Sequence, residues 1–178
     1  MPCLEDIRSV CYWTIKISAR EDWLPIASGS LTKIIEKKDT TRVYVYKTET
    51  PLNSLRIGFC LGQFRCATMQ DHPLVYHFTV TKKAFDWIEF CFIPGKVVRE
   101  IVEMIEAFIN RKMQTKLSLV FLPNIGEGLG DFRKIVIAHA GLLILDERFL
   151  FNHNVIEYRH KFNEALAEAI AFKFFGGN

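Results

Sequence analysis

The stretch Phe92 to Phe108, FIPGKVVREIVEMIEAF, contains the point at which the repeat of apolar residues changes along the chain. Before Pro94-Gly95 the apolar residues mostly alternate with a period of two, which is typical of half-buried strands. After this pair they recur with a period near 3.6, which predicts a helix over 96–112. The apolar face of that predicted helix consists of Val97, Ile101, Met104, Ile105 and Phe108. The change of period predicts an α+β fold with a boundary at residue 94.

The residues before this boundary carry the signals of an all-β unit. Strands are predicted where alternating or continuous apolar runs lie between turn residues, with loops at the spacing typical of sandwich-like sheets. The turn signals are Ser28-Gly29-Ser30 and the hairpin connection 38–41. The predicted strands are 11–18, 31–36, 42–48, 55–60, 74–80 and 87–93. We therefore assign residues 1–94 to part of a β-domain.

The residues after the boundary alternate between helix and strand signals. Following the helix over 96–112, we predict a strand at 117–122, a loop at 123–130 and a single buried strand at 135–145. A helix over 158–175 is predicted to end near Gly176, a common residue after a helix C-terminus. This order predicts the beginning of an α+β domain over residues 95–178.

Composition is typical of a folded protein without a strong charge preference for polyanionic partners. Of its 178 residues 49% are hydrophobic, which is enough for a packed core. The 23 basic and 20 acidic residues leave a net charge of +3, and pairs such as Lys37-Lys38 and Lys82-Lys83 are isolated from one another. Composition therefore permits contact with nucleic acid but does not indicate it.

The cysteines and the apolar segments bear on the compartment. The five cysteines are odd in number and lie mostly among apolar residues, which favours buried thiols in a reducing compartment. Pairing or zinc binding by Cys60 and Cys66 is the alternative, although no C-x-x-C motif supports it. The longest apolar run, 135–145, is too short to span a bilayer, and no signal peptide pattern begins the chain. The cytosol or the nucleus is predicted.

Three acidic or imidazole side chains form the most metal-like pattern in the sequence. His160, Glu164 and Glu168 follow one another at four-residue spacing on the predicted C-terminal helix. Ligands at the two ends of this row would lie about 12 Å apart at 1.5 Å per residue, too far to converge on one ion. The row is therefore interpreted as a solvated helix face.

Two other patterns have a structural interpretation that is stronger than the functional one. The loop Gly126 to Gly130, GEGLG, resembles a phosphate-binding loop, but it has no following Lys-Ser or Lys-Thr and opens no helix. We interpret it as a linker. His139 lies inside an apolar run, where an isolated histidine is usually a packed core or cleft residue.

The last fourteen residues, ALAEAIAFKFFGGN, resemble the zinc-site helix of the gluzincin aminopeptidases, H-E-L-A-H-Q-W-F-G-N, without its histidines. In that family two histidines four residues apart hold zinc, and the glutamate between them is the general base. Aligned on the aromatic pair and the glycine, Glu168 and Phe172 stand at the histidine positions and Ala169 at the base. The resemblance therefore implies a site without zinc ligands or a base.

A second segment resembles the part of the same family that binds the free amine of the substrate. Residues 135–147, IVIAHAGLLILDE, are similar to G-A-M-E-N-W-G-L-I-T-Y-R-E, with Gly141 and Glu147 retained. Ala138 stands where that family has its amine-binding glutamate. The resemblance thus implies the loss of amine recognition together with the loss of metal binding.

The chain also resembles the histidine-free relatives of these enzymes, the aminopeptidase-like TBP-associated factors of the general transcription factor TFIID. Residues 1–17 are similar to their P-C-x-D and C-x-W segments, and 54–64 to their S-x-A-I-G-P-F-E strand. Residues 144–147 are similar to I-I-D-E, and 166–176 to L-A-Q-S-L-A-Q-Q-F-F-G. These matches occur in the same order along both chains.

This second resemblance implies a nuclear, non-catalytic scaffold in RNA polymerase II transcription initiation. Its fold would be part of an aminopeptidase-type β-domain, a saddle or sandwich, followed by the start of a thermolysin-like domain. The expected partners are TBP and other TFIID subunits, with core-promoter DNA also permitted. No cofactor, metal, membrane or small-molecule substrate is expected. Because the family continues on both sides of the matched segments, the chain is expected to be a fragment; the alternative is a fragment of a diverged zinc aminopeptidase.

Overall fold

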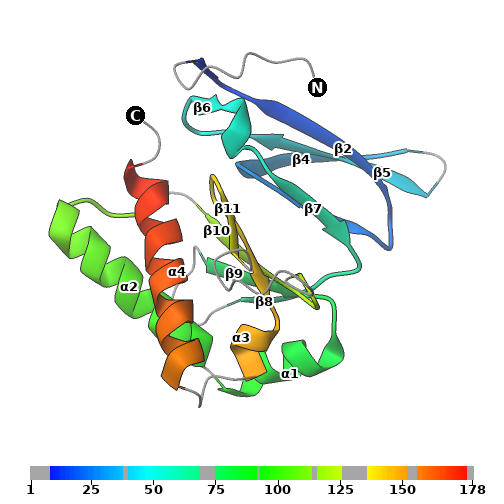
Figure 1. Cartoon of the computed structure of the whole chain (residues 1–178). Helices are drawn as coiled ribbons and strands as arrows, with labels where there is room; N and C mark the ends of the chain where they lie inside the picture. Colours follow the sequence, from blue (N-terminus) through cyan, green and yellow to red (C-terminus); the bar gives the residue numbers. More distant parts are fainter. Residues whose placement is uncertain are drawn as a thin grey trace.

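The computed structural model describes residues 9–37, 40–68, 75–91, 93–113, 116–125, 136–151 and 156–175. Within these residues the strands form four small sheets, and four α-helices and the short 3-10 helix η1 (Ser54–Arg56) accompany them. Figure 1 shows the strands of the first half of the chain gathered together and the helices packed around a sheet formed mainly by the second half. The predicted α+β class is confirmed.

An antiparallel sheet with the strand order β2-β5-β4 forms the first part of the chain. Its strands are β2 (Thr14–Arg20), β5 (Thr41–Lys47) and β4 (Ser30–Glu36). Tyr44 and Tyr46 of β5 are buried on one face, opposite Ile17 and Ile15 of β2. Burial, with a smaller contribution from Tyr44, raises the pKa of Tyr46 to about 12. The period-two pattern therefore buries one face of this sheet.

Two short strand pairs complete the first half. In one, β3 (Leu24–Ala27) pairs with β7 (Phe59–Gly62), and in the other β1 (Val10–Cys11) pairs with β6 (Leu52–Asn53). The indole Nε1 of Trp13 donates a hydrogen bond of 2.8 Å to the carbonyl of Leu52, so this side chain holds the start of the chain against β6.

A five-stranded mixed sheet with the order β11-β12-β10-β9-β8 forms the centre of the second half. The inner strands β9, β10 and β12 run parallel, whereas the outer strands β8 and β11 are antiparallel to their neighbours. The strands are β8 (Arg65–Thr68), β9 (Val75–Thr79), β10 (Leu117–Leu122), β11 (Val136–His139) and β12 (Leu142–Asp146). Every residue of β12 and most of β10 are buried, as expected for strands covered on both faces.

Helices cover one face of this sheet and a strand pair covers the other. On the helical side, Leu119, Phe121 and Leu143 pack in one core with residues of all four helices. On the opposite side, Val120 and Ile144 pack in a core with residues of β3 and β7. The helices are α1 (Lys82–Cys91), α2 (Ile93–Ile109), α3 (Arg148–Phe151) and α4 (Ile156–Phe175). Helices α1 and α2 form the crossover that parallel strands β9 and β10 require.

The predicted strand at 87–93 is wrong, because residues 87–91 lie in α1 and residue 93 begins α2. Thr81 caps α1: its Oγ1 accepts a hydrogen bond of 3.2 Å from the N–H of Ala84, and its carbonyl accepts one from Phe85. Pro94 and Gly95 lie in the first turn of α2 rather than between two units. Proline is tolerated there because the first N–H groups of a helix have no intrahelical acceptor.

Three other predicted elements differ in their details. The predicted strand at 55–60 consists of η1 followed by β7, and the single strand at 135–145 is the β11–β12 hairpin, which turns at Gly141 with φ 74°. The predicted apolar face of α2 is wrong only at Met104 and Phe108, which are 61% and 87% exposed; its other members pack in the core. The buried face of α2 is formed by Val98, Ile101, Val102 and Ile105.

The remaining strand and helix predictions are confirmed to within a few residues. These are the strands at 11–18, 31–36, 42–48, 74–80 and 117–122 and the helices at 96–112 and 158–175. The division at residue 94 stays a prediction. We note, however, that β8 and β9, from the expected first unit, hydrogen-bond into the same sheet as β10 and β12. Two predicted features lie outside the described residues: the linker at 126–130 and the end of the last helix near residue 176.

Candidate functional site

The C-terminal helix α4 presents its inner face to the core and the expected zinc position to solvent. Leu166 and Ile170 are fully buried on the inner face. Glu168 lies on the outer side and is exposed. Ala169 and Phe172 belong to the same helix, but their side chains lie outside the described residues. Glu168, Ala169 and Phe172 therefore all lie on one helix, as the resemblance to a zinc-site helix requires.

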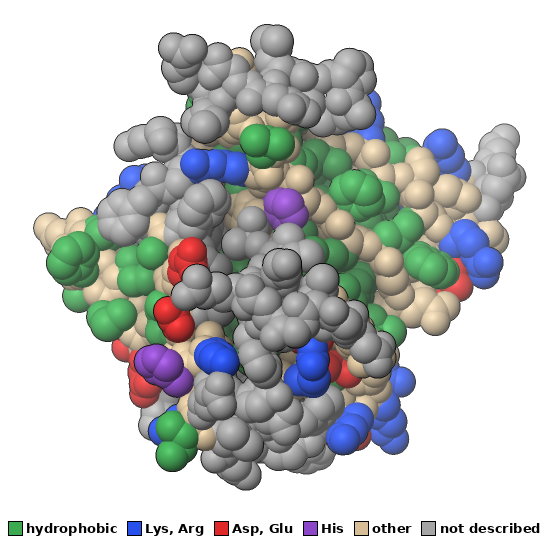
Figure 2. All heavy atoms as spheres, viewed as in Figure 1, with side chains coloured by type: hydrophobic (Ala, Val, Ile, Leu, Met, Phe, Trp, Pro, Cys, Tyr) green, Lys and Arg blue, Asp and Glu red, His purple; other side chains and the backbone are tan. Residues whose placement is uncertain are grey.

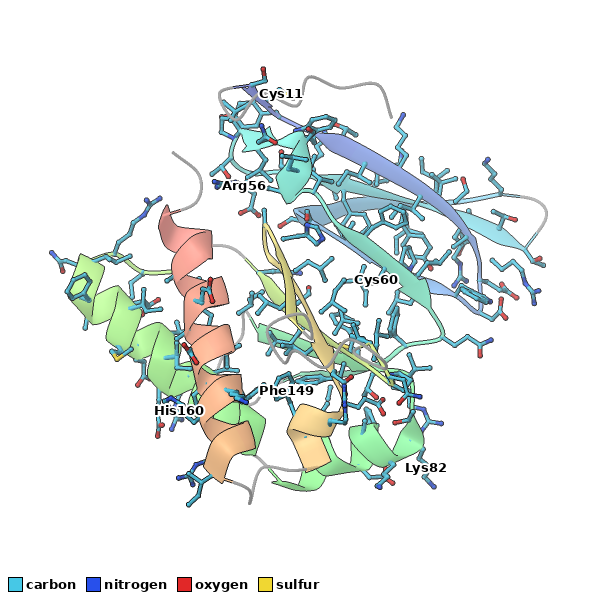
Figure 3. All side chains as sticks on the ribbon, in the orientation of Figure 1. Cys11, Arg56, Cys60, Lys82, Phe149 and His160 are labelled. Atoms are coloured by element: carbon cyan, nitrogen blue, oxygen red, sulfur yellow. The ribbon has the colours of Figure 1, made fainter. Side chains whose placement is uncertain are left out.

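The row His160, Glu164 and Glu168 is exposed along its whole length, which confirms the interpretation as a solvated face. His160 is labelled on the first half of α4 in Figure 3. Across the part of the chain that the structure describes, no group of three or more His, Cys, Asp or Glu side chains could hold a metal ion. Together with alanine and phenylalanine at the other positions, this donor set does not fit zinc.

The expected amine-binding position lies on a strand that touches α4. Ala138 is in β11 and pairs with Leu143 of β12, and its side chain lies outside the described residues. Helix α4 contacts β11, so the two segments that resemble the aminopeptidase site lie together although about thirty residues separate them in sequence. Within the described residues β11 is an outer strand, with β12 as its strand partner.

The tip of the β11–β12 hairpin contacts the segment that joins η1 to β7. The N–H of Ala140 donates a hydrogen bond of 3.0 Å to the carbonyl of Arg56, which Figure 3 labels beside the hairpin. The imidazole of His139 lies directly against the α-carbon of Gly58: a methyl group added there would be 2.1 Å from His139 Cδ2. This contact joins the two halves of the chain next to Ala138.

The backbone of Gly58 is fixed by the buried Ser28. The N–H of Gly58 donates to Ser28 Oγ at 3.0 Å, and the N–H of Ser28 donates to the carbonyl of Gly58 at 3.0 Å. Ser28 is fully buried. Glycine is therefore required at position 58 because the imidazole occupies the space of a side chain, and the backbone cannot withdraw without breaking these bonds.

We expect Gly58→Ala to lower the free energy of unfolding by about 1–3 kcal/mol, the usual cost of overpacking. Adding His139→Ala should recover part of this loss, because the smaller side chain vacates the space. Urea unfolding of the two single variants and the double variant measures the coupling. Additive effects would show that the two residues do not compete for this space.

His139 also gives a pH dependence of stability. Burial lowers the pKa of His139 from its ordinary value of 6.5, and its Nδ1 is buried with no hydrogen-bond partner among the described residues. The neutral ring is favoured in the folded chain, so its stabilising contribution is complete above the unfolded pKa and is lost as the pH falls through the folded pKa. We expect urea midpoints to fall from pH 7.5 to 5.5 more steeply for the wild type than for His139→Gln. Equal slopes would contradict this assignment.

The described cysteines are free thiols, but of these only Cys60 is buried as the sequence predicted, since Cys11 and Cys66 are exposed. Cys60 is buried, and burial raises its pKa to about 11; burial also raises the pKa of Cys66. Neither thiol is therefore activated as a nucleophile. The alternative of a Cys60–Cys66 disulfide is wrong, because both are unpaired. Cys3 and the side chain of Cys91 lie outside the described residues.

The retained glutamate of the second resembling segment has a structural role. Glu147 is buried, and its Oε1 accepts a hydrogen bond of 2.9 Å from Oγ1 of Thr81, the residue that caps α1. The neighbouring Asp146, fully buried, is bound by the guanidinium of Arg148. Neither contact was predictable from the sequence, since each depends on how strand ends meet in the sheet.

Comparisons with known proteins do not assign the chain to a family. No protein-family model matches it, and a search of curated proteins finds no significantly similar sequence. Among the described residues, no helix is both long and apolar enough to cross a membrane.

Proposed function

We propose that the chain is a non-catalytic scaffold related to TBP-associated factor 2 of TFIID, the aminopeptidase-like subunit of that complex. In this role it acts in the nucleus, in RNA polymerase II transcription initiation, through contacts with TBP and other TFIID subunits. Its surfaces also permit contact with core-promoter DNA. The finer fold that we propose is part of an aminopeptidase-type β-domain followed by the start of a thermolysin-like domain.

The observation that carries the proposal is the contact between α4 and β11. These two elements hold the positions of the zinc ligands and of the amine-binding glutamate in the enzymes that the sequence resembles. Their proximity is what a common ancestral site requires.

The residues at these positions explain why the proposal excludes peptidase chemistry by this site. Glu168 is a single carboxylate on an exposed helix face, and neither alanine nor phenylalanine can bind zinc or accept a proton. Ala138 cannot form an ion pair with a free amine. The hydrophobic contacts of Leu166 and Ile170 keep α4 in place without a metal, so the site persists as a surface.

Binding to purified TBP and to purified TFIID subcomplexes tests the proposal. We expect the complete 178-residue chain to co-elute with at least one of them in size-exclusion chromatography and to bind it with a micromolar or tighter dissociation constant. Glu168→Arg, at the former zinc position, should weaken binding more than the matched control Glu103→Arg on α2, whose side chain is 62% exposed. Failure to bind any of them would contradict the scaffold role, and zinc-dependent hydrolysis would favour the alternative of a diverged aminopeptidase.

A further inference from the structure

Three lysines that are far apart in the sequence share one face of the β2-β5-β4 sheet. Lys16 of β2 and Lys33 of β4 both pair with Val45 of β5, one on each side of it. Lys47 follows two residues after Val45 on the same strand. Residues opposite one another in antiparallel strands, and residues two apart in one strand, project from the same face. We call Lys16, Lys33 and Lys47 the lysine triangle.

The dimensions of the sheet place these lysines within reach of one ligand. The α-carbons of Lys16 and Lys33 lie two strand spacings apart, about 9–10 Å, and Lys47 lies about 7 Å along the strand from Val45. Val45 is only 7% exposed although it faces outwards, which fits the aliphatic stems of the lysines covering it. The three lysines therefore project from one face of the sheet around Val45.

The charge of the triangle is not neutralised within the described chain. Among the described residues no carboxylate forms an ion pair with any of the three lysines. Two acidic side chains at the borders of the sheet are engaged elsewhere: Asp22 pairs with Arg20, and Glu49 accepts a hydrogen bond from Ser30. Figure 2 shows Lys and Arg side chains on the right-hand side of the molecule, where Figure 1 draws β2, β4 and β5.

Apolar side chains adjoin the triangle on the same face. Ile35 of β4 is opposite Val43 of β5, one row along from Lys33 and Val45, and Ile35 is 39% exposed. A ligand that carries only phosphates would leave this apolar surface in water. A polypeptide that combines carboxylates with apolar side chains can neutralise the lysines and bury Ile35 at the same time.

We infer that this face binds an acidic segment of a partner protein, one in which Asp or Glu residues alternate with apolar residues. The inference deepens the proposed scaffold role, and rests on it, by naming the chemistry of one protein contact. The lysine triangle attracts and orients the acidic side chains, and Ile35 and Val43 supply the apolar contact. The binding surface is distant in sequence from α4 and β11.

A synthetic peptide provides the test without any TFIID component. The probe is a fluorescein-labelled 14-residue peptide in which pairs of glutamates alternate with single leucines; the control peptide has glutamine in place of glutamate. Fluorescence anisotropy with the complete chain should show binding of the acidic peptide alone, weakening as salt is raised. The variant K16Q/K33Q/K47Q should lose about tenfold or more in affinity. The matched variant K82Q/K83Q/K161Q, with the same change of charge on helices, should bind within about twofold of the wild type.

Two results would overturn the inference. One is equal binding of the acidic peptide by the two triple variants, which would leave only a non-specific charge effect. The other is a 20-base-pair DNA duplex that binds more tightly than the peptide and depends on the same three lysines, which would assign the face to nucleic acid. Neither result depends on TBP binding, so failure of this inference and failure of the proposed function are distinguishable.

Discussion

Arg148→Leu should lower the free energy of unfolding by about 3–5 kcal/mol, because it removes the guanidinium that forms an ion pair with a fully buried carboxylate. The side chain of Asp146 is fully buried at the end of β12, whereas that of Arg148 is 41% exposed. The guanidinium binds both carboxylate oxygens: Nε donates to Oδ1 at 2.9 Å and Nη2 to Oδ2 at 3.0 Å. The N–H of Arg148 also donates to Oδ1 at 2.8 Å. The variant loses both guanidinium bonds and keeps the backbone hydrogen bond to Oδ1.

Substitution of one partner of this ion pair should lower the free energy of unfolding more than substitution of the other. Asp146→Asn leaves a half-exposed arginine that water can solvate, so we expect a smaller loss, about 1–2 kcal/mol. The double variant Asp146→Asn, Arg148→Leu should be more stable than Arg148→Leu alone, because a neutral amide needs no counter-charge. Urea unfolding of the three variants measures these differences. If Arg148→Leu were as stable as the wild type, the buried ion pair would contribute nothing.

Gly29→Ala is the second variant with a large expected effect, about 2–4 kcal/mol, from a left-handed backbone and a backbone overlap together. Gly29 has φ 91° in the turn between β3 and β4. An added methyl group would lie 2.4 Å from the carbonyl oxygen of Lys47 and 2.7 Å from its carbon. Both neighbours are backbone atoms of β5, so no side-chain rotation can relieve the contact. The first residues of β4 must separate from β5.

The consequence of Gly29→Ala should extend to the lysine triangle, because β4 carries Lys33. We expect a lower urea midpoint together with weaker binding of the acidic peptide. Gly62→Ala is the control, since its added methyl group would meet only the ring of Phe64, at 3.1 Å. That side chain can move. A wild-type midpoint for Gly29→Ala would show that the turn adopts another conformation.

The sequence predicted those helices and strands whose own residues show a clear repeat of apolar positions. The alternation in 14–20 and the apolar run 117–122 predicted strands, and the segment 158–175 was predicted as a helix. Helix α1 was missed because its aromatic residues favour strands in isolation, and its start depends on Thr81 as a cap. The tertiary core, which buries Ala84 and Ile88, overrides that preference.

For the candidate site, the sequence predicted the individual segments that form it but not the contacts between distant segments. Sequence resemblance grouped Ala138 with Glu168, and the contact of β11 with α4 agrees with that grouping. The contact of His139 with Gly58 was not predictable, because any apolar run can contain a histidine and nothing in 54–60 indicates what covers it. The lysine triangle likewise needs the strand register, since positions 16, 33 and 47 have no common period.

The central proposal is that this chain, which resembles the aminopeptidases in sequence, acts without zinc chemistry. The most direct measurement is the zinc content of the purified complete chain, together with hydrolysis of aminoacyl p-nitroanilides by the same sample with and without a chelator. We predict zinc far below one ion per chain and no chelator-sensitive hydrolysis. One zinc ion per chain, with hydrolysis that the chelator abolishes, would contradict the account.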